Sequence, residues 1–374
     1  MPRKPKAVDP LNQIEDLLRA TWDLEPGPTK IALLEEAVRL ADAHADEQLG
    51  FELRENLIEA ATFGGAPEVA LVAFAWSLAA YDRDPEADYN LYGLLWKYKW
   101  VLDAAADYPS IGRAQIRDML ADMERRYTAA GFGLHPVHQT AREVYRYMGD
   151  IPAAKAAHAL VKKSPRDALS NCPACEEQNQ LKYYLTLGKP ATAIKKAEPL
   201  VDGRMSCAQV PHVTYSYLLL PVLFAGDPAT AVEYHRRGVR MLGTNPKHVA
   251  NAAFHLIFLA VTDNLPAAAR YLEKHLGNGL ATTCPAWRFD FASAAAFALD
   301  RLIARPRQLR VRVPAGAALP AGLDPTDLTA LRDYFRGEAR EVAAAFNARN
   351  GNDAFTRRLA DVDALHERVT PYPL

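Results

Sequence analysis

A proline returns every 38 residues through the middle of this 374-residue chain. It occurs at Pro152, Pro190, Pro228 and Pro266, and each copy opens a short run that is rich in alanine. A fixed period of 20 to 50 residues is the mark of an array in which one structural unit is stacked on the next. The period therefore predicts the architecture of the chain much more firmly than it predicts its function.

The residues around these prolines also repeat. A glycine stands two or three residues before three of the prolines, at Gly149, Gly188 and Gly226. In the fourth repeat this place is taken by Asn264. Glycine can take the left-handed conformation that ends a helix, and proline is tolerated in the first turn of the next one. The predicted unit is therefore helix, tight turn, helix. Five residues after each turn residue stands an alanine that lets the two helices approach closely: Ala154, Ala193, Ala231 and Ala269.

The same pattern occurs upstream. Gly27-Pro28 is followed by Ala32, and Gly65-Ala66-Pro67 is followed by Ala70. Gly112 marks a degenerate copy that lacks both the proline and the alanine. We count about seven units and predict an all-α protein.

This pattern resembles the tetratricopeptide repeat family, whose helical hairpins turn at glycine and carry alanine in the second helix. Proline often follows that helix, as Pro165 and Pro246 do here. The resemblance covers roughly residues 12 to 303, although the period is longer than the family's and its early tryptophan is missing. It implies a right-handed superhelical solenoid of about seven repeats, in which the first helices line a concave groove that holds a peptide or a partner protein.

The chain divides into four predicted segments. Residues 1–10 form a flexible tail, 11–305 the solenoid, 306–324 an extended segment with a linker, and 325–374 a C-terminal helical cap. In the third segment, residues 308–313 alternate apolar and basic side chains, which predicts a β-strand with Leu309, Val311 and Val313 on one face. The strand either lies across the cap or offers an edge to a partner's strand.

Composition restricts the classes of function. The net charge is −1, so a nucleic-acid partner is not expected. The basic N-terminus is not followed by the apolar core of a signal peptide, and no apolar run is long enough for a membrane span, which favours a cytoplasmic protein. Four cysteines are too few for a disulfide framework, and the alanine-rich, arginine-rich composition suits a bacterial source. Known catalytic motifs are missing, so we do not expect an enzyme.

The strongest chemical signal is Cys172-Pro173-Ala174-Cys175. Its cysteines fall where one repeat leads into the next, and Cys207 and His212 fall at the corresponding place one repeat later. Zinc takes about four nitrogen or sulfur ligands, so we predict a structural zinc site formed by Cys172, Cys175, Cys207 and His212. His135 and His138 lie one repeat earlier at nearly the same position within the repeat. They could replace Cys207 and His212 as ligands. His248 and Cys284 are expected to lie too far along the array.

Three hypotheses about these cysteines remain open. A structural zinc site would join two repeats, ordinary buried cysteines would have no chemical role, and Cys172 with Cys175 could form a redox dithiol. The predicted function is correspondingly a protein-binding or peptide-binding scaffold that carries a zinc site. The alternatives are a peptide-responsive bacterial regulator, and a thiol redox sensor or enzyme that uses Cys172 and Cys175.

Overall fold

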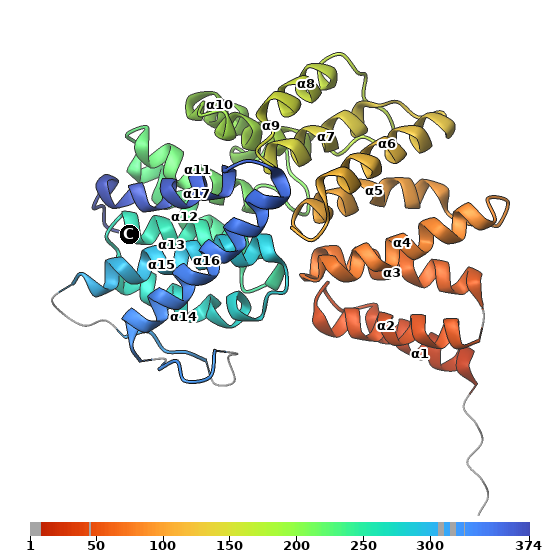
Figure 1. Ribbon diagram of the computed structural model, residues 1–374, viewed down its shortest axis with the longest axis horizontal. Helices are drawn as coiled ribbons and strands as arrows, with labels where there is room; N and C mark the ends of the chain where they lie inside the picture. The colour runs from red at the N-terminus through yellow and green to blue at the C-terminus, as the bar shows by residue number, and fades with distance from the viewer. Residues whose placement is uncertain (1–8, 45, 306–309, 315–318, 325) are drawn as a thin grey trace, which may run out of the picture.

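The computed structural model describes residues 9–44, 46–305, 310–314, 319–324 and 326–374. Within these ranges every regular element is a helix, as Figure 1 shows, and the prediction of an all-α protein is confirmed. The α-helices are α1 Pro10–Thr21, α2 Pro28–Ala43, α3 Glu47–Gly64, α4 Pro67–Arg83, α5 Leu91–Ala106, α6 Arg113–Ala129, α7 His135–Tyr147, α8 Ile151–Val161, α9 Pro173–Thr186, α10 Pro190–Val201, α11 His212–Phe224, α12 Pro228–Leu242, α13 Val249–Val261, α14 Leu265–Ala281, α15 Pro285–Ile303, α16 Leu328–Asn350 and α17 Ala354–Asp363; the 3₁₀ helices are η1 Pro246–His248 and η2 Ala364–Arg368.

The predicted turns lie between paired helices. Their glycines adopt the left-handed conformation, with φ of 94° at Gly65, 77° at Gly149, 66° at Gly188 and 92° at Gly226. The prolines occupy the first turn of the helix that follows. The acidic side chains after two of the glycines cap these helices, because Asp150 accepts the N–H of Ala153 and Asp227 accepts that of Thr230. Local sequence thus explains where these hairpins turn.

Two copies of the pattern depart from the prediction. In the fourth repeat the left-handed residue is Asp263, with φ of 61°, whereas Asn264 has φ of −84°. The glycine position therefore corresponds to Asp263. In the first copy Gly27 is extended, with φ of 174°, and Ala32 is exposed rather than packed. The other predicted alanines are buried: Ala70, Ala154, Ala193, Ala231 and Ala269.

Most helices that are adjacent in sequence pack against each other along the chain. The first helices of neighbouring pairs also touch, as in α3 with α5, α5 with α7, α11 with α13, and α13 with α15. Two large apolar cores result, one from α1 to α7 and one from α9 to α17. A small third core holds Ala174, Leu200 and Val210, and the three partly exposed cysteines pack against it.

The C-terminal helices pack against the first half of the chain as well as against α15. The Arg349 guanidinium at the end of α16 donates to the carbonyls of Ala106 (2.9 Å), Tyr108 (3.2 Å) and Ile111 (3.4 Å), which follow or end α5. The Asn352 amide donates to the Met148 carbonyl at 2.9 Å. The C-terminal helices therefore connect the two halves of the chain (Figure 1).

Two loops make further contacts between the halves. The Thr283 hydroxyl donates to the Glu68 carboxylate at 2.7 Å, and the turn at Gly65 lies against Pro246. These partners are more than 180 residues apart in sequence. The C-terminal half of the chain therefore contacts the N-terminal half at these loops.

The predicted strand is wrong for the residues that the structure describes. Residues 310–314 form no strand, while 308 and 309 lie outside the described residues. Val311 is buried in the C-terminal core, and the Arg312 N–H donates to the Glu273 carboxylate of α14 at 2.7 Å. The alternation of apolar and basic side chains therefore reflects burial of one side of an extended segment on a helix, and not pairing in a sheet.

Gly149 has two reasons to be glycine, and this predicts a large effect of substitution. Its φ is positive, and a Cβ there would collide with the Cβ of Ala354 at the start of α17. We expect Gly149→Ala to lower the free energy of unfolding by about 3 kcal/mol, from left-handed strain and overpacking together. Gly188→Ala is the matched control, because Gly188 has a similar φ and open space around it. Denaturant unfolding that gave equal losses would refute the contact with α17.

A second pair of glycines lies on α14. A Cβ on Gly279 would penetrate the Phe291 ring of α15, whereas Gly277 faces open space. We expect Gly277→Ala to stabilise the protein by about 1 kcal/mol through helix propensity. Gly279→Ala should destabilise it by about 2 kcal/mol, because overpacking exceeds that gain. A thermal melt of both variants that showed shifts of the same sign would contradict this packing of α14 on α15.

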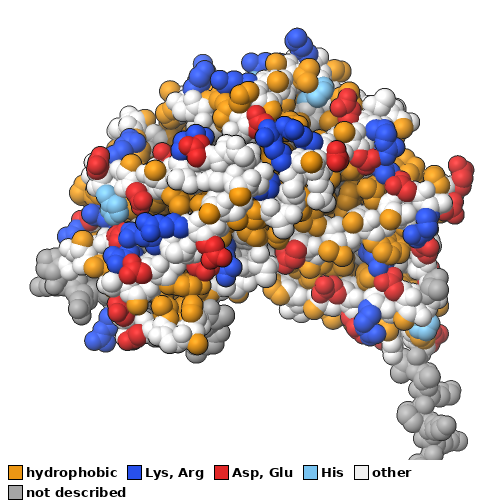
Figure 2. Space-filling model, in the orientation of Figure 1, with side chains coloured by type: hydrophobic (Ala, Val, Ile, Leu, Met, Phe, Trp, Pro, Cys, Tyr) orange, Lys and Arg blue, Asp and Glu red, His pale blue; other side chains and the backbone are white. Residues whose placement is uncertain are grey.

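The surface carries charges of both signs. Figure 2 shows lysine and arginine side chains interspersed with aspartate and glutamate over the face in view. Within the described residues, no helix has both the length and the apolar character needed to cross a bilayer.

Candidate metal centre

Two of the predicted ligands lie at the start of α9. Cys172 is the N-cap residue, and its Sγ accepts the backbone N–H of Cys175 at 3.4 Å. Pro173 occupies the first helical position, where a missing N–H has no cost. The first turn of the helix therefore places both sulfurs on the same side of the chain.

The third sulfur comes from the loop that joins α10 to α11. In this loop the N–H of Cys207 donates to the Val210 carbonyl at 3.0 Å, and the N–H of Val210 donates back to the Cys207 carbonyl at 3.3 Å. The N–H of Gln209 donates to the Cys207 Sγ at 3.4 Å. This tight turn holds the thiol in a defined direction.

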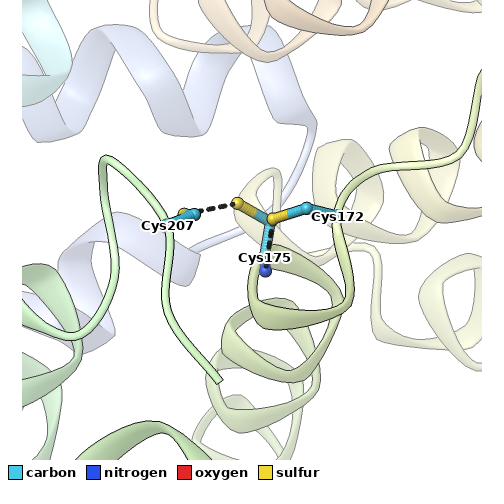
Figure 3. A group of neighbouring side chains, drawn as sticks. All are labelled: Cys172, Cys175 and Cys207. Atoms are coloured by element: carbon cyan, nitrogen blue, oxygen red, sulfur yellow. Dashed lines mark hydrogen bonds between the residues drawn. The ribbon is translucent and has the colours of Figure 1, made fainter. Parts of the chain in front are cut away.

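The structure brings Cys172, Cys175 and Cys207 together. Their sulfurs all lie within 4.8 Å of one another, and the Cys175 and Cys207 sulfurs are 3.5 Å apart (Figure 3). All three side chains are half-buried. Three of the four predicted ligands are therefore grouped as a metal site requires.

The environment of the thiols suits a cation. Burial raises the pKa of the Cys175 thiol well above its usual range, and the neighbouring Cys172 and Cys207 raise it further. Three thiolates this close would repel one another without a positive charge between them. Sulfur ligands select soft or borderline metal ions such as zinc or monovalent copper. The donor set thus fits such an ion, with three protein ligands instead of four.

The predicted fourth ligand, His212, does not belong to this group. His212 begins α11, and its buried ring packs edge-on against the His248 ring, with 5.3 Å between the centroids. Burial lowers the pKa of His212 to about 4. Its position five residues after Cys207 is close in sequence, but the start of α11 directs the imidazole toward η1.

The alternative histidines are also held elsewhere. His135 Nδ1 lies 2.9 Å from the Ser164 carbonyl, and its Nε2 lies 3.1 Å from the Gln139 amide. His138 Nδ1 lies 2.9 Å from the Ser164 hydroxyl. Neither histidine joins the three sulfurs.

Cys284 lies apart from the other cysteines, as expected. It is fully buried in a cluster with Phe289, Phe346 and Phe355. Cys284 therefore serves as a control for substitutions of the other cysteines, because it should take no part in binding metal.

Sequence reasoning missed Met205. Its side chain packs against the same small core as the three cysteines. Met205 stands two residues before Cys207, in a loop predicted to bind metal, and this proximity in sequence could have indicated that it lies near the cysteines.

The sequence matches no family model, and a search of curated proteins finds no match. The function must therefore be argued from the geometry of the chain itself.

Proposed function

We propose that this protein is a tetratricopeptide-like α-solenoid of about seven repeats that binds a protein or peptide, with a structural zinc ion in its middle repeats. The successive hairpins, the contacts between their first helices and the buried turn alanines support the repeat architecture. Arrays of this kind present long surfaces on which another chain can lie.

The grouping of three sulfurs carries the zinc assignment. Cys172 and Cys175 come from α9, and Cys207 comes from the loop before α11, so that one ion would connect the entry segments of two consecutive hairpins. Zinc supplies bonds of about 2.3 Å to each thiolate, and it adds no redox chemistry of its own. Three such bonds would hold the loop between α10 and α11 against the N-terminus of α9.

A groove near the N-terminus is our candidate for the binding surface. It has a volume of about 390 Å³ and lies between α1, α2 and α3. Its lining includes Leu18, Asn56, Glu59 and Trp22, whose side chain is 76% exposed. An exposed tryptophan beside a concave surface is typical of protein recognition. The residues that line it belong to these three helices and to the loop between α1 and α2.

One observation supports a second candidate, a thiol redox function. The sulfurs of Cys175 and Cys207 are in contact at 3.5 Å, so this pair is placed to form a disulfide. Oxidation by one molecule of hydrogen peroxide would join the two sulfurs, transfer the two thiol hydrogens to the oxidant as two water molecules, and remove two thiolates from any metal.

Metal content tests the proposal. We expect native mass spectrometry of protein purified without added zinc to show one zinc per chain. Cys175→Ser should lose the zinc, and Cys284→Ser should keep it, because Cys284 lies outside the group. Metal-free protein with a reversible Cys175–Cys207 disulfide would instead support the redox candidate. Zinc retained in Cys175→Ser would refute the site.

A further inference from the structure

We infer that the metal at Cys172, Cys175 and Cys207 has one open coordination position, and that this position accepts an imidazole from outside the chain. The inference rests on the proposed metal centre and extends it. It assigns the site a second role, in which the bound ion is a docking point for a histidine-bearing partner.

The chain does not supply a fourth ligand in this structure. Every cysteine, histidine, aspartate and glutamate of the sequence lies in the described ranges. Among them the three cysteines are the group whose ligand atoms meet. Zinc bound to three protein ligands completes its tetrahedron with a molecule from solution or from a partner.

Two possible donors that lie close to Cys207 in the sequence are unsuited to the open position. His212 would have to leave its buried packing against His248. Met205 packs beside the cysteines, but zinc is bound by thiolate, imidazole and carboxylate, and a thioether is not among these donors. A donor from outside the chain must therefore occupy the fourth coordination position of the ion.

The site is accessible from outside. Cys172, Cys175 and Cys207 are all partly exposed, in contrast to the fully buried Cys284. A donor can therefore reach an ion bound to the three sulfurs without unfolding the chain.

Charge decides which donor is preferred. Three thiolates and one divalent zinc ion have a net charge of −1. A fourth thiolate or a carboxylate would raise this to −2 beside the apolar side chains of Leu200, Val210 and Val213, which is costly because they cannot solvate it. A neutral imidazole leaves the charge at −1, and it is a common zinc ligand.

Cobalt(II) provides a direct test, because its visible absorption reports the ligands around it. We expect the reduced protein to bind one cobalt ion per chain with an intense thiolate band. Added imidazole should shift the visible bands in a saturable way. His212→Ala and Met205→Leu should bind cobalt and respond to imidazole as the parent does, because neither residue is a ligand.

The possible results separate the inference from the proposal on which it rests. Cobalt bands that do not respond to imidazole, and that change in His212→Ala, would show a closed site and overturn the inference while the metal centre stands. Failure to bind cobalt would overturn both. Sedimentation with and without zinc tests a second copy as the source of the donor. His44 and His366 are the histidines that are exposed in the described ranges, so zinc-dependent dimers that disappear in His44→Ala or His366→Ala would show that a second copy supplies the imidazole. A zinc-loaded monomer would exclude a second copy as the source.

Discussion

Lowering the pH from 7 to 5 is expected to remove about 7 kcal/mol from the free energy of unfolding, which is a large part of a typical domain's stability. Burial lowers the pKa of seven histidines below the usual 6.5, His138 and His255 among them. In the other five the pKa falls to about 4 in four cases and to about 3 in the last: His158, His212, His235, His275 and His248. Each of these side chains is buried in a helical core or at a helix start.

The direction of the effect follows from which state takes up the protons. Below pH 6.5 the unfolded chain protonates these imidazoles while the folded chain keeps them neutral, so each costs about 2 kcal/mol at pH 5. Burial raises the pKa of Asp107 to about 8, so the folded chain takes up that proton first and regains about 3 kcal/mol. Asp103 and Asp290, whose pKa values are also raised by burial, reduce the net loss further, whereas His255, whose pKa is lowered well below 6.5, increases it.

One variant isolates the histidine contribution. His275 Nε2 is buried and has no hydrogen-bond partner among the described residues. His275→Leu should match the parent at pH 7 and exceed it by about 2 kcal/mol at pH 5. His44→Leu changes an exposed histidine and should leave the pH profile unchanged. Urea titrations at both pH values would contradict this account if the two variants behaved alike.

Replacing Arg349 should weaken the contact between the two halves of the chain. Its guanidinium donates to three carbonyls at and beyond the end of α5, where helix carbonyls have no partner within the helix. Burial lowers the pKa of Arg349, which shows how far the group is removed from water. We expect Arg349→Met to cost about 3 kcal/mol, because the carbonyls lose charge-assisted donors and stay partly buried.

The control for this variant lies on the same helix. Arg340 is exposed on α16, so Arg340→Met should change stability by less than about 0.5 kcal/mol. Chemical denaturation of both variants tests the difference. An Arg349→Met protein as stable as Arg340→Met would mean that α16 does not hold the N-terminal half.

The local features of this fold could be predicted from the sequence because each depends on a few adjacent residues. The glycine turns, the prolines in the first helical turn and the stop of α16 at Gly351 belong to this class. The strand prediction failed because an alternating pattern records burial of one side, and it does not show whether a sheet or a helix covers that side. Val311 is buried on helices.

The metal centre shows the same limit. The positions of Cys172, Cys175 and Cys207 within the repeat predicted that they lie close together, and their sulfurs do meet. It could not show that the ring of His212 turns toward His248, because that direction depends on how α11 begins and on the packing of η1. The contact of Arg349 with the end of α5 joins residues about 240 positions apart, and no local signal predicts it.

Hydrogen exchange with and without a metal chelator tests the central claim most directly, which is that a metal ion at Cys172, Cys175 and Cys207 holds the loop before α11 against α9. Removing the ion should speed exchange in residues 202–211 and in the first turn of α9, and it should leave α1 to α4 unchanged, since they lie in the other core. Exchange that stays the same after chelation, or that rises uniformly along the chain, would contradict the claim.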